Sequence, residues 1–339
     1  MKYALTIGMF FLFFTGCKHL SNSNPFSKVI VKSIVEDSLL NIRALELNRH
    51  TLKAVSSVGD VYTYDARTAQ ISIDRISADT LNFRASAIVE NSYFTLSIGS
   101  PAYLFKDQKL VYKEMHPAVF YDALHFWNSK EGIAIGDPTD GCMSVIITRD
   151  GGLTWQKTPC ELLPPALQGE AAFAASDTNI AIIGDQTWVA TGGRSSRVLY
   201  SSDKGMTWNV FETPIVQGFE TTGMYSIDFY DALNGFAIGG DYTKPKNQKS
   251  NKIRTKDGGE TWKVVAQGQN PGYRSCVQYV PNSNAMGLVA VGFEGIDYSQ
   301  DGGATWKHLS DEGFYSLRFL NDSVAFAAGK GKISKLTFK

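Results

Sequence analysis

The chain has 339 residues, of which 43% are hydrophobic and 12% aromatic, a composition that supports a large buried core and argues against intrinsic disorder. Lys and Arg number 33, and Asp and Glu also number 33, so the chain carries no net charge. A neutral chain lacks the electrostatic attraction between basic proteins and phosphate backbones, which excludes nucleic acid from the expected partners.

The N-terminal segment has the pattern of an export signal. Lys2 supplies a positive flank, residues 4–14 are almost wholly apolar, and Thr15 and Gly16 precede Cys17. The apolar run is too short to span a bilayer as a helix, which takes about 20 residues. The small pair before Cys17 resembles the lipobox of bacterial lipoproteins, although Phe14 stands where Leu is usual.

The resulting prediction is a signal peptide over residues 1–16 and a lipidated Cys17 that opens a polar tether over residues 17–28. The mature protein is then a monomeric lipoprotein on the periplasmic side of the outer membrane, and its only contact with the membrane is the lipid. An ordinary signal peptide with an incidental cysteine is the alternative interpretation.

Three cysteines remain in the mature chain if Cys17 is acylated. Cys142 and Cys160 flank one repeat and could form a disulfide, but two unpaired thiols are an equally open alternative; Cys276 is the odd residue. The sequence has no CxxC pairing of the metal-binding type, and we expect neither a metal nor another cofactor.

One octapeptide occurs four times along the chain, as TRDGGLTW, SSDKGMTW, TKDGGETW and SQDGGATW. Each copy reads as a β-hairpin turn in which the aspartate accepts turn N–H bonds, glycine supplies positive φ, and the tryptophan packs into the core. The structural residues are Asp150, Trp155, Asp203, Trp208, Asp257, Trp262, Asp301 and Trp306. The aspartates are 53, 54 and 44 residues apart, the length of one four-stranded propeller blade.

A second repeated feature, an apolar run ending in a glycine step, occurs seven times between Val58-Gly59 and Ala328-Gly329. It predicts an all-β, seven-bladed β-propeller over residues 29–339 as a single domain, with six or eight blades as alternatives. Residues 29–37 have no partner of their own, so we expect this N-terminal strand to close the ring and protect the edges of the last blade.

The four octapeptides resemble the Asp-box, or bacterial neuraminidase repeat, and the mature chain is similar to the group of the photosystem II stability and assembly factor. This resemblance implies a propeller. It implies no single activity, because relatives in the wider group include sialidases, xyloglucan hydrolases, sorting receptors and assembly chaperones.

Polar residues gather in the loops that a propeller brings to one face. The glycine-step loops and the links between blades carry the candidate site residues: Asp137, Asp140, Arg194, Asp241, Tyr242, Glu294, Arg84, Glu170 and Arg274, with Arg43 and His116 at equivalent links. An arginine that enters an innermost strand needs a carboxylate partner or an anionic ligand. Ordinary turn chemistry and structural Arg–Asp pairs are the competing interpretation. The lysine-rich insertion at residues 240–252 is expected to be a solvated, mobile lip.

The favoured function is non-catalytic: an exported binding or scaffold propeller, similar to an assembly factor, that presents a polar channel face to a protein partner or to an anionic or saccharide ligand. The alternative is a glycan hydrolase of sialidase or other type, with Asp137, Glu170, Asp241 and Tyr242 as catalytic candidates. An oxidoreductase is a weaker second alternative, because no dinucleotide or haem motif occurs.

Overall fold

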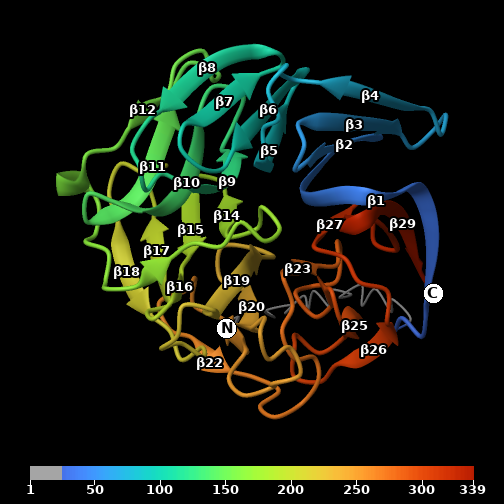
Figure 1. Ribbon diagram of the computed structural model, residues 1–339. Helices are drawn as coiled ribbons and strands as arrows, with labels where there is room; N and C mark the ends of the chain where they lie inside the picture. Colours follow the sequence, from blue (N-terminus) through green and yellow to red (C-terminus); the bar gives the residue numbers. More distant parts are fainter. Residues whose placement is uncertain (1–24) are drawn as a thin grey trace, which may run out of the picture.

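The structure, a computed structural model, describes residues 25–339, and these residues are almost entirely β-sheet (Figure 1). The predicted signal peptide, Cys17 and most of the tether lie outside the described residues. Within residues 25–339 the one helical element is a 3-10 turn, η1 (Cys160–Leu162), and no helix is long and apolar enough to cross a membrane. Figure 1 shows the sheets side by side around a common centre, so that the blue start of the chain lies next to its red end.

Four of the sheets have four antiparallel strands in chain order. They are β5 (Phe83–Val89), β6 (Ser92–Ser97), β7 (Ala102–Lys106) and β8 (Lys109–Glu114); β9 (Tyr121–Phe126), β10 (Gly132–Thr139), β11 (Cys142–Thr148) and β12 (Gln156–Lys157); β14 (Ile180–Ile183), β15 (Gln186–Ala190), β17 (Arg197–Ser201) and β18 (Asn209–Glu212); and β23 (Cys276–Tyr279), β24 (Leu288–Gly292), β25 (Gly295–Ser299) and β26 (Lys307–Ser310).

The other two sheets contain more strands. A six-stranded sheet consists of β13 (Glu170–Ala171), β16 (Gly192–Gly193), β19 (Thr222–Phe229), β20 (Gly235–Asp241), β21 (Lys252–Thr255) and β22 (Lys263–Val264). A seven-stranded sheet runs β27 (Ser316–Phe319), β28 (Val324–Ala328), β29 (Lys330–Phe338), β1 (Val29–Asn48), β2 (Thr51–Ser56), β3 (Asp60–Asp65) and β4 (Ile71–Arg75). The long strand β1 joins its two halves, because its first part pairs with β29 and its last part with β2.

Polarity increases from the inner to the outer strand of each sheet. The second strands, such as β10, β20 and β24, are buried along most of their length and carry continuous apolar runs, as strands covered on both faces do. The outer strands β12, β18 and β26 have two to four residues, none of them buried. The hydrophobic core lies between neighbouring sheets, where for example Phe94 of β6 packs in one cluster with Leu124 of β9 and Ile146 of β11.

The four octapeptides form turns between the last two strands of their sheets, and their aspartates make the same contacts each time. Asp150 accepts the Thr154 N–H at 3.0 Å and the Thr154 hydroxyl at 2.7 Å. Asp203, Asp257 and Asp301 repeat this pair of bonds with Thr207, Thr261 and Thr305. Trp155 and Trp262 are buried, whereas Trp208 and Trp306 are half-buried against the core.

The second glycine of the octapeptide is required by the contact between sheets. Gly152 has φ +75°, and a Cβ atom there would lie 2.3 Å from the ring of Phe94 in the preceding sheet. Gly303 is in the same position against Phe236. Only glycine both tolerates this backbone conformation and allows the approach, so the turn also connects adjacent sheets.

Residues 172–179, which lead from β13 to β14, cross the centre of the molecule; in Figure 1 this yellow-green loop reaches inward before β14. Asp177 accepts the backbone N–H groups of Ser86 in β5 at 2.8 Å and Leu124 in β9 at 3.0 Å. Its carbonyl accepts a hydrogen bond from Arg318 in β27. Ser176 donates to the carbonyl of Ser275 beside β23. The segment therefore connects the inner strands of several sheets, and we call it the crossing segment.

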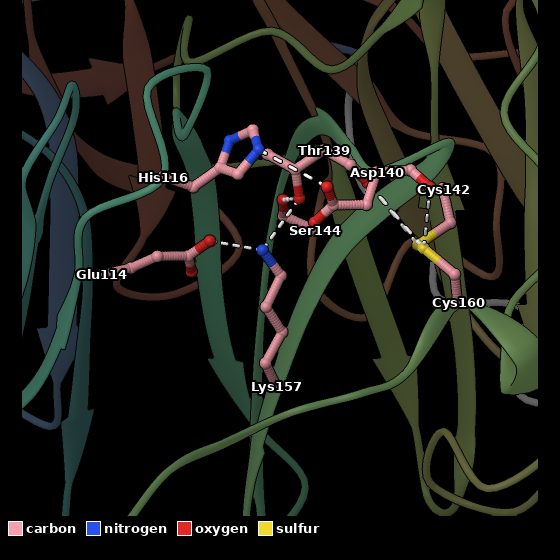
Figure 2. Close-up of a disulfide and its surroundings, with 8 residues drawn as sticks. All are labelled: Glu114, His116, Thr139, Asp140, Cys142, Ser144, Lys157 and Cys160. Carbon is pink, nitrogen blue, oxygen red and sulfur yellow. Dashed lines mark hydrogen bonds and ion pairs between the residues drawn. A yellow bond between two sulfur atoms is a disulfide. The ribbon is translucent and has the colours of Figure 1, made fainter.

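Cys142 and Cys160 form a disulfide, with Cα atoms 5.5 Å apart (Figure 2). This decides between the two alternatives that the sequence leaves open, and Cys276 is a buried free thiol. Beside the disulfide, the Lys157 ammonium lies between Glu114 and the Thr139 hydroxyl. The disulfide ties the turn between β10 and β11 to the loop that leads toward the crossing segment.

Candidate functional site

A cavity of about 690 Å³ opens above the crossing segment at one end of the inner strands. Its floor consists of residues 172–175 of the crossing segment and the preceding Ala171 of β13. Charged side chains line one part of its wall and aromatic rings another. The lining consists of Arg43, Arg84, Phe120, Asp122, Asp137, Glu220, Tyr225, Tyr242, Tyr273, Phe293 and Tyr315 together with residues 171–175.

A recurring β-bulge directs one side chain of several inner strands into this cavity. The register shifts between Ile42 and Ala44 in β1, so that Arg43 is left unpaired in the ladder. The same irregularity leaves Arg84 in β5, Asp122 in β9 and Tyr225 in β19 between their paired neighbours. A bulge re-aims the extra residue, and all four of these residues line the cavity.

Arg43 and Arg84 lie close together without an acidic partner. Their guanidinium groups donate to the carbonyls of Ala175 and Ala174 in the crossing segment, at 3.3 and 3.4 Å. Among residues 25–339 no carboxylate lies within 4.0 Å of either group. Burial and the neighbouring charge of Arg43 lower the pKa of Arg84 to about 10. Two like charges in a partly enclosed cavity are an arrangement that an anion would stabilise.

Three acidic side chains line the cavity with these arginines: Glu220, which pairs with the exposed Arg194, and the aspartates Asp122 and Asp137. Asp122 is fully buried, and burial followed by repulsion from Asp137 raises its pKa well above the ordinary value. Burial also raises the pKa of Asp137 to about 6, although its carboxylate accepts the Ala172 N–H at 2.9 Å. Because both pKa values are raised, Asp122 and Asp137 are less ionised at neutral pH than ordinary aspartates. They therefore neutralise less of the positive charge of the two arginines.

The aromatic wall consists of rings that pack on one another. Phe173 of the crossing segment stacks on Tyr225 with 4.0 Å between ring centroids, and Tyr273 meets Tyr225 edge-on at 4.8 Å. Tyr242, which is 48% exposed, lies 6.4 Å from both tyrosines. On the charged side, the Arg43 guanidinium stacks 4.0 Å above the centroid of Tyr315. The cavity thus combines an apolar, ring-lined surface with two unpaired cations.

The residues singled out in the sequence fall into three groups. Arg84, Asp137 and Tyr242 line the cavity together. Arg194, Asp140 and Glu294 are exposed and lie outside its lining; Arg194 pairs with Glu220 at 3.3 Å, and Asp140 lies 3.5 Å from His116. These exposed pairs contribute little to stability or to a site.

The third group is buried and engaged elsewhere. Glu170 is held by Arg197 at 2.6 Å, and Arg274 by Asp297 at 2.5 Å. Asp241 accepts the N–H and the hydroxyl of Thr243. None of these three residues is part of the cavity lining, so the structure does not bring the proposed carboxylates Asp137, Glu170 and Asp241 together in that cavity.

The lysine-rich insertion at residues 240–252 is not the fully solvated lip expected from its sequence. Lys252 is completely buried, and its ammonium donates to the carbonyl of Pro271 at 2.6 Å and to that of Gln269 at 2.9 Å. Desolvation lowers its pKa to about 7. The N–H of Tyr273 donates to the carbonyl of Pro245, which ties the insertion to the cavity wall. The sequence did not indicate this because the acceptors are backbone carbonyls of a distant loop.

Sequence reasoning did not select Asp122, Tyr225 or Tyr315 as site residues. The sequence does contain a pattern that identifies them. Each of the three follows a bulky apolar or aromatic residue and precedes Ala or Ser where an inner strand begins, as do Arg43 and Arg84. Tyr273 and Phe293, which lie outside this pattern, carry no such signal. Their place in the wall depends on how the loops of neighbouring sheets meet.

The sequence matches no protein-family model, and no curated protein matches it. Solved structures do match along nearly the whole chain. YCF48 from Cyanidioschyzon merolae is similar with a TM-score of 0.65 and 12% identity, covering 91% of this chain and 98% of that chain. YCF48 bound to D1 peptide gives 0.63 and 13%, covering 93% and 98%, and the WD40 repeats of RRP9 give 0.63 and 11%, covering 93% and 99%. Together with the radial four-stranded sheets, these likenesses identify the fold of the chain as a β-propeller.

Proposed function

We propose that this protein is a non-catalytic binding propeller that holds a segment of a partner protein in the central cavity, with an anionic group of that segment on Arg43 and Arg84. The observation that carries the proposal is the pair of arginines without a carboxylate partner, next to an aromatic wall. Aromatic side chains and arginines are the residues that most often supply binding energy in interfaces. A cavity of about 690 Å³ accommodates one or a few side chains, not a folded domain.

The structural relatives support a protein segment as the ligand. One of the similar structures is YCF48 bound to D1 peptide. At 13% identity this relative supports the kind of partner and not its sequence. The proposed role is accordingly that of an assembly-factor-like scaffold with an unidentified protein partner.

The finer architecture belongs to the same proposal. We infer a ring of seven blades with Asp-box turns, in which the first part of β1 completes the last blade beside β29 and its last part begins the first blade. The pairing of Val29 with Phe338 and of Leu45 with Ala54 supports this division of the strand. Residues 1–16 as signal peptide and a lipidated Cys17 would place a monomeric propeller at the periplasmic side of the outer membrane.

A second candidate is a glycan hydrolase or a saccharide-binding protein. It is favoured by one observation: Asp122 and Asp137 are two carboxyl groups with raised pKa values in one cavity, beside rings on which a sugar could stack. Glu170 and Asp241 are not among its catalytic groups, because neither lines the cavity. Release of a chromophore from a panel of aryl glycosides, lost in Asp137→Asn, would favour it over the binding role.

The proposed function is tested by selecting peptides from a random library on the purified mature protein and measuring their affinities by calorimetry. Arg43→Ala and Arg84→Ala should each weaken binding about tenfold, since each removes a charge-assisted contact worth about 1.5 kcal/mol. Arg75→Ala is the matched control, because this exposed arginine and its partner Asp60 both lie outside the cavity lining. Selected peptides without acidic groups, or equal binding by all three variants, would contradict the proposal.

A further inference from the structure

Asp122 is the most unusual polar group of the cavity. The bulge in β9 directs its carboxyl group into the cavity, yet the residue has no exposed surface in the free protein. Within residues 25–339 both carboxyl oxygens are buried and make no hydrogen bond of standard geometry, although the backbone N–H groups of Ala174 and Asp137 are near enough to lower the pKa. A buried polar group without partners normally has a functional reason or an absent partner.

The surroundings decide the charge of this carboxyl group. A charged carboxylate without hydrogen bonds is strongly destabilised in a buried position, so the neutral acid is the stable form. The charged groups that share the cavity are Arg84 from β5, Arg43 from β1, Asp137 from β10 and Glu220 from the loop before β19. Neither arginine comes within 4.0 Å of Asp122; burial and then repulsion from Asp137 keep the pKa of Asp122 raised, and they outweigh the charge of Arg84, which lowers that pKa. A neutral acid differs from a carboxylate in one important respect, because it carries an O–H donor.

We propose that Asp122 binds the partner's anionic group as a neutral acid, donating its proton in a hydrogen bond alongside the two arginines. The inference rests on the proposed function and specifies how the same site selects its ligand. The arginines supply charge, and Asp122 supplies a donor that is already desolvated, so the site favours a carboxylate over a neutral amide of the same shape. A positively charged ligand gains nothing from this arrangement, because Asp122 offers it no negative charge.

The acids make the binding depend on pH. Because burial raises the pKa of Asp122 well above its ordinary value, this residue keeps its donor at neutral pH. The pKa of Asp137 is raised to about 6, so the negative charge of Asp137 disappears as the pH falls through 6. Affinity for an anion should therefore increase as the pH falls from 8 to 5 and decrease once Asp122 ionises at higher pH.

The experiment uses 4-hydroxyphenylacetate as the probe, since it combines a carboxylate with a ring, and its amide as the neutral control. Binding to the mature protein is followed by NMR titration. Asp122→Asn retains an N–H donor in the same place and should bind the probe within about twofold of the wild type, whereas Asp122→Ala should bind about fivefold more weakly. Asp137→Asn should remove the increase in affinity below pH 6.

A direct measurement covers the case in which Asp122→Ala does not fold. The 13C chemical shift of the Asp122 carboxyl carbon in the wild type should be that of the protonated acid at pH 7. A carboxyl that titrates below pH 5 would overturn the inference. The inference would also be overturned if Asp122→Ala bound the probe as tightly as the wild type while Arg84→Ala did not bind it. That result would leave the proposed function intact. A wild type that binds neither the probe nor any acidic peptide would overturn both.

Discussion

Arg274 and Asp297 form an ion pair inside the protein, with Nη2 2.5 Å from Oδ2 and both side chains at most 5% exposed. A second guanidinium nitrogen donates to the backbone carbonyl of Tyr273. The other oxygen of Asp297 contacts His308 at 3.0 Å. Arg274, a ligand-binding candidate in the sequence, is thus engaged on several sides by its own chain.

We expect Arg274→Ala to reduce the free energy of unfolding by about 3–5 kcal/mol, because it leaves Asp297 as a buried charge with one partner fewer. Urea denaturation at pH 7 measures this change. The exposed Arg194→Ala should lie within about 0.5 kcal/mol of the wild type. If both variants are equally stable, the pair does not contribute as the structure indicates.

His308 should make stability depend on pH. Partial burial opposes its charge, but hydrogen bonds to Asp297 and Asp311 raise its pKa above the usual 6.5. A raised pKa in the folded state stabilises the fold fully below pH 6.5, and this contribution is lost as the pH rises through the folded value. His308→Gln should therefore be less stable than the wild type at pH 5.5 and equal to it at pH 9. A stability difference that is the same at both pH values would count against this role.

The octapeptide aspartates should stabilise the fold independently of any ligand. Asp257 accepts bonds from Thr255 and from both the N–H and the hydroxyl of Thr261. We expect Asp257→Ala to cost about 1–2 kcal/mol in urea denaturation, the usual effect of losing hydrogen bonds to a charged acceptor. Glu260→Ala, at an exposed position in the same turn, is the control and should have little effect. Peptide affinity should be unchanged in both variants.

The disulfide closes a loop with a sequence separation of 18 residues, for which chain-entropy arguments give about 3 kcal/mol of stabilisation. A reducing agent should lower the melting temperature of the wild type, and Cys142→Ala/Cys160→Ala should melt at the lower temperature with or without it. Cys276→Ala should keep the sensitivity to reduction, because Cys276 is the free thiol. Insensitivity of the wild type to a reductant that opens the bond would show that the bond adds no stability.

The sequence predicted the parts of the fold that arise from local periodicity. The octapeptides and glycine steps predict sheets and turns because a hairpin is decided within about ten residues, and the structure has an all-β fold with four-stranded sheets. Arg84, Asp137 and Tyr242, three of the candidate residues, line one cavity. The repeat indicates this grouping because each stands at the same end of an inner strand or its hairpin.

The pairing of charges could not be predicted in the same way. Glu170 and Arg197 are 27 residues apart, and Arg318 reaches Glu46 over 272 residues, so no local pattern links them. Asp177 resembles an ordinary loop residue in the sequence, although its carboxyl group accepts backbone N–H groups from two inner strands, β5 and β9. Which acid neutralises which base depends on the arrangement of sheets in space, and that decides which residues remain free for a ligand.

The crossing segment also constrains the order in which the molecule can assemble. Residues 172–179 lie near the middle of the chain, but strands made later, such as β19 and β27, must settle against them. The two ends of the described chain also meet, where the Ser27 hydroxyl donates to the carbonyl of Lys339, 312 residues away. Contacts between residues so distant in the sequence slow the search for the native state. The same contacts must break before the crossing segment can leave the centre of the molecule. This topology favours slow opening, so the mature protein should persist by kinetic resistance to proteases as much as by equilibrium stability.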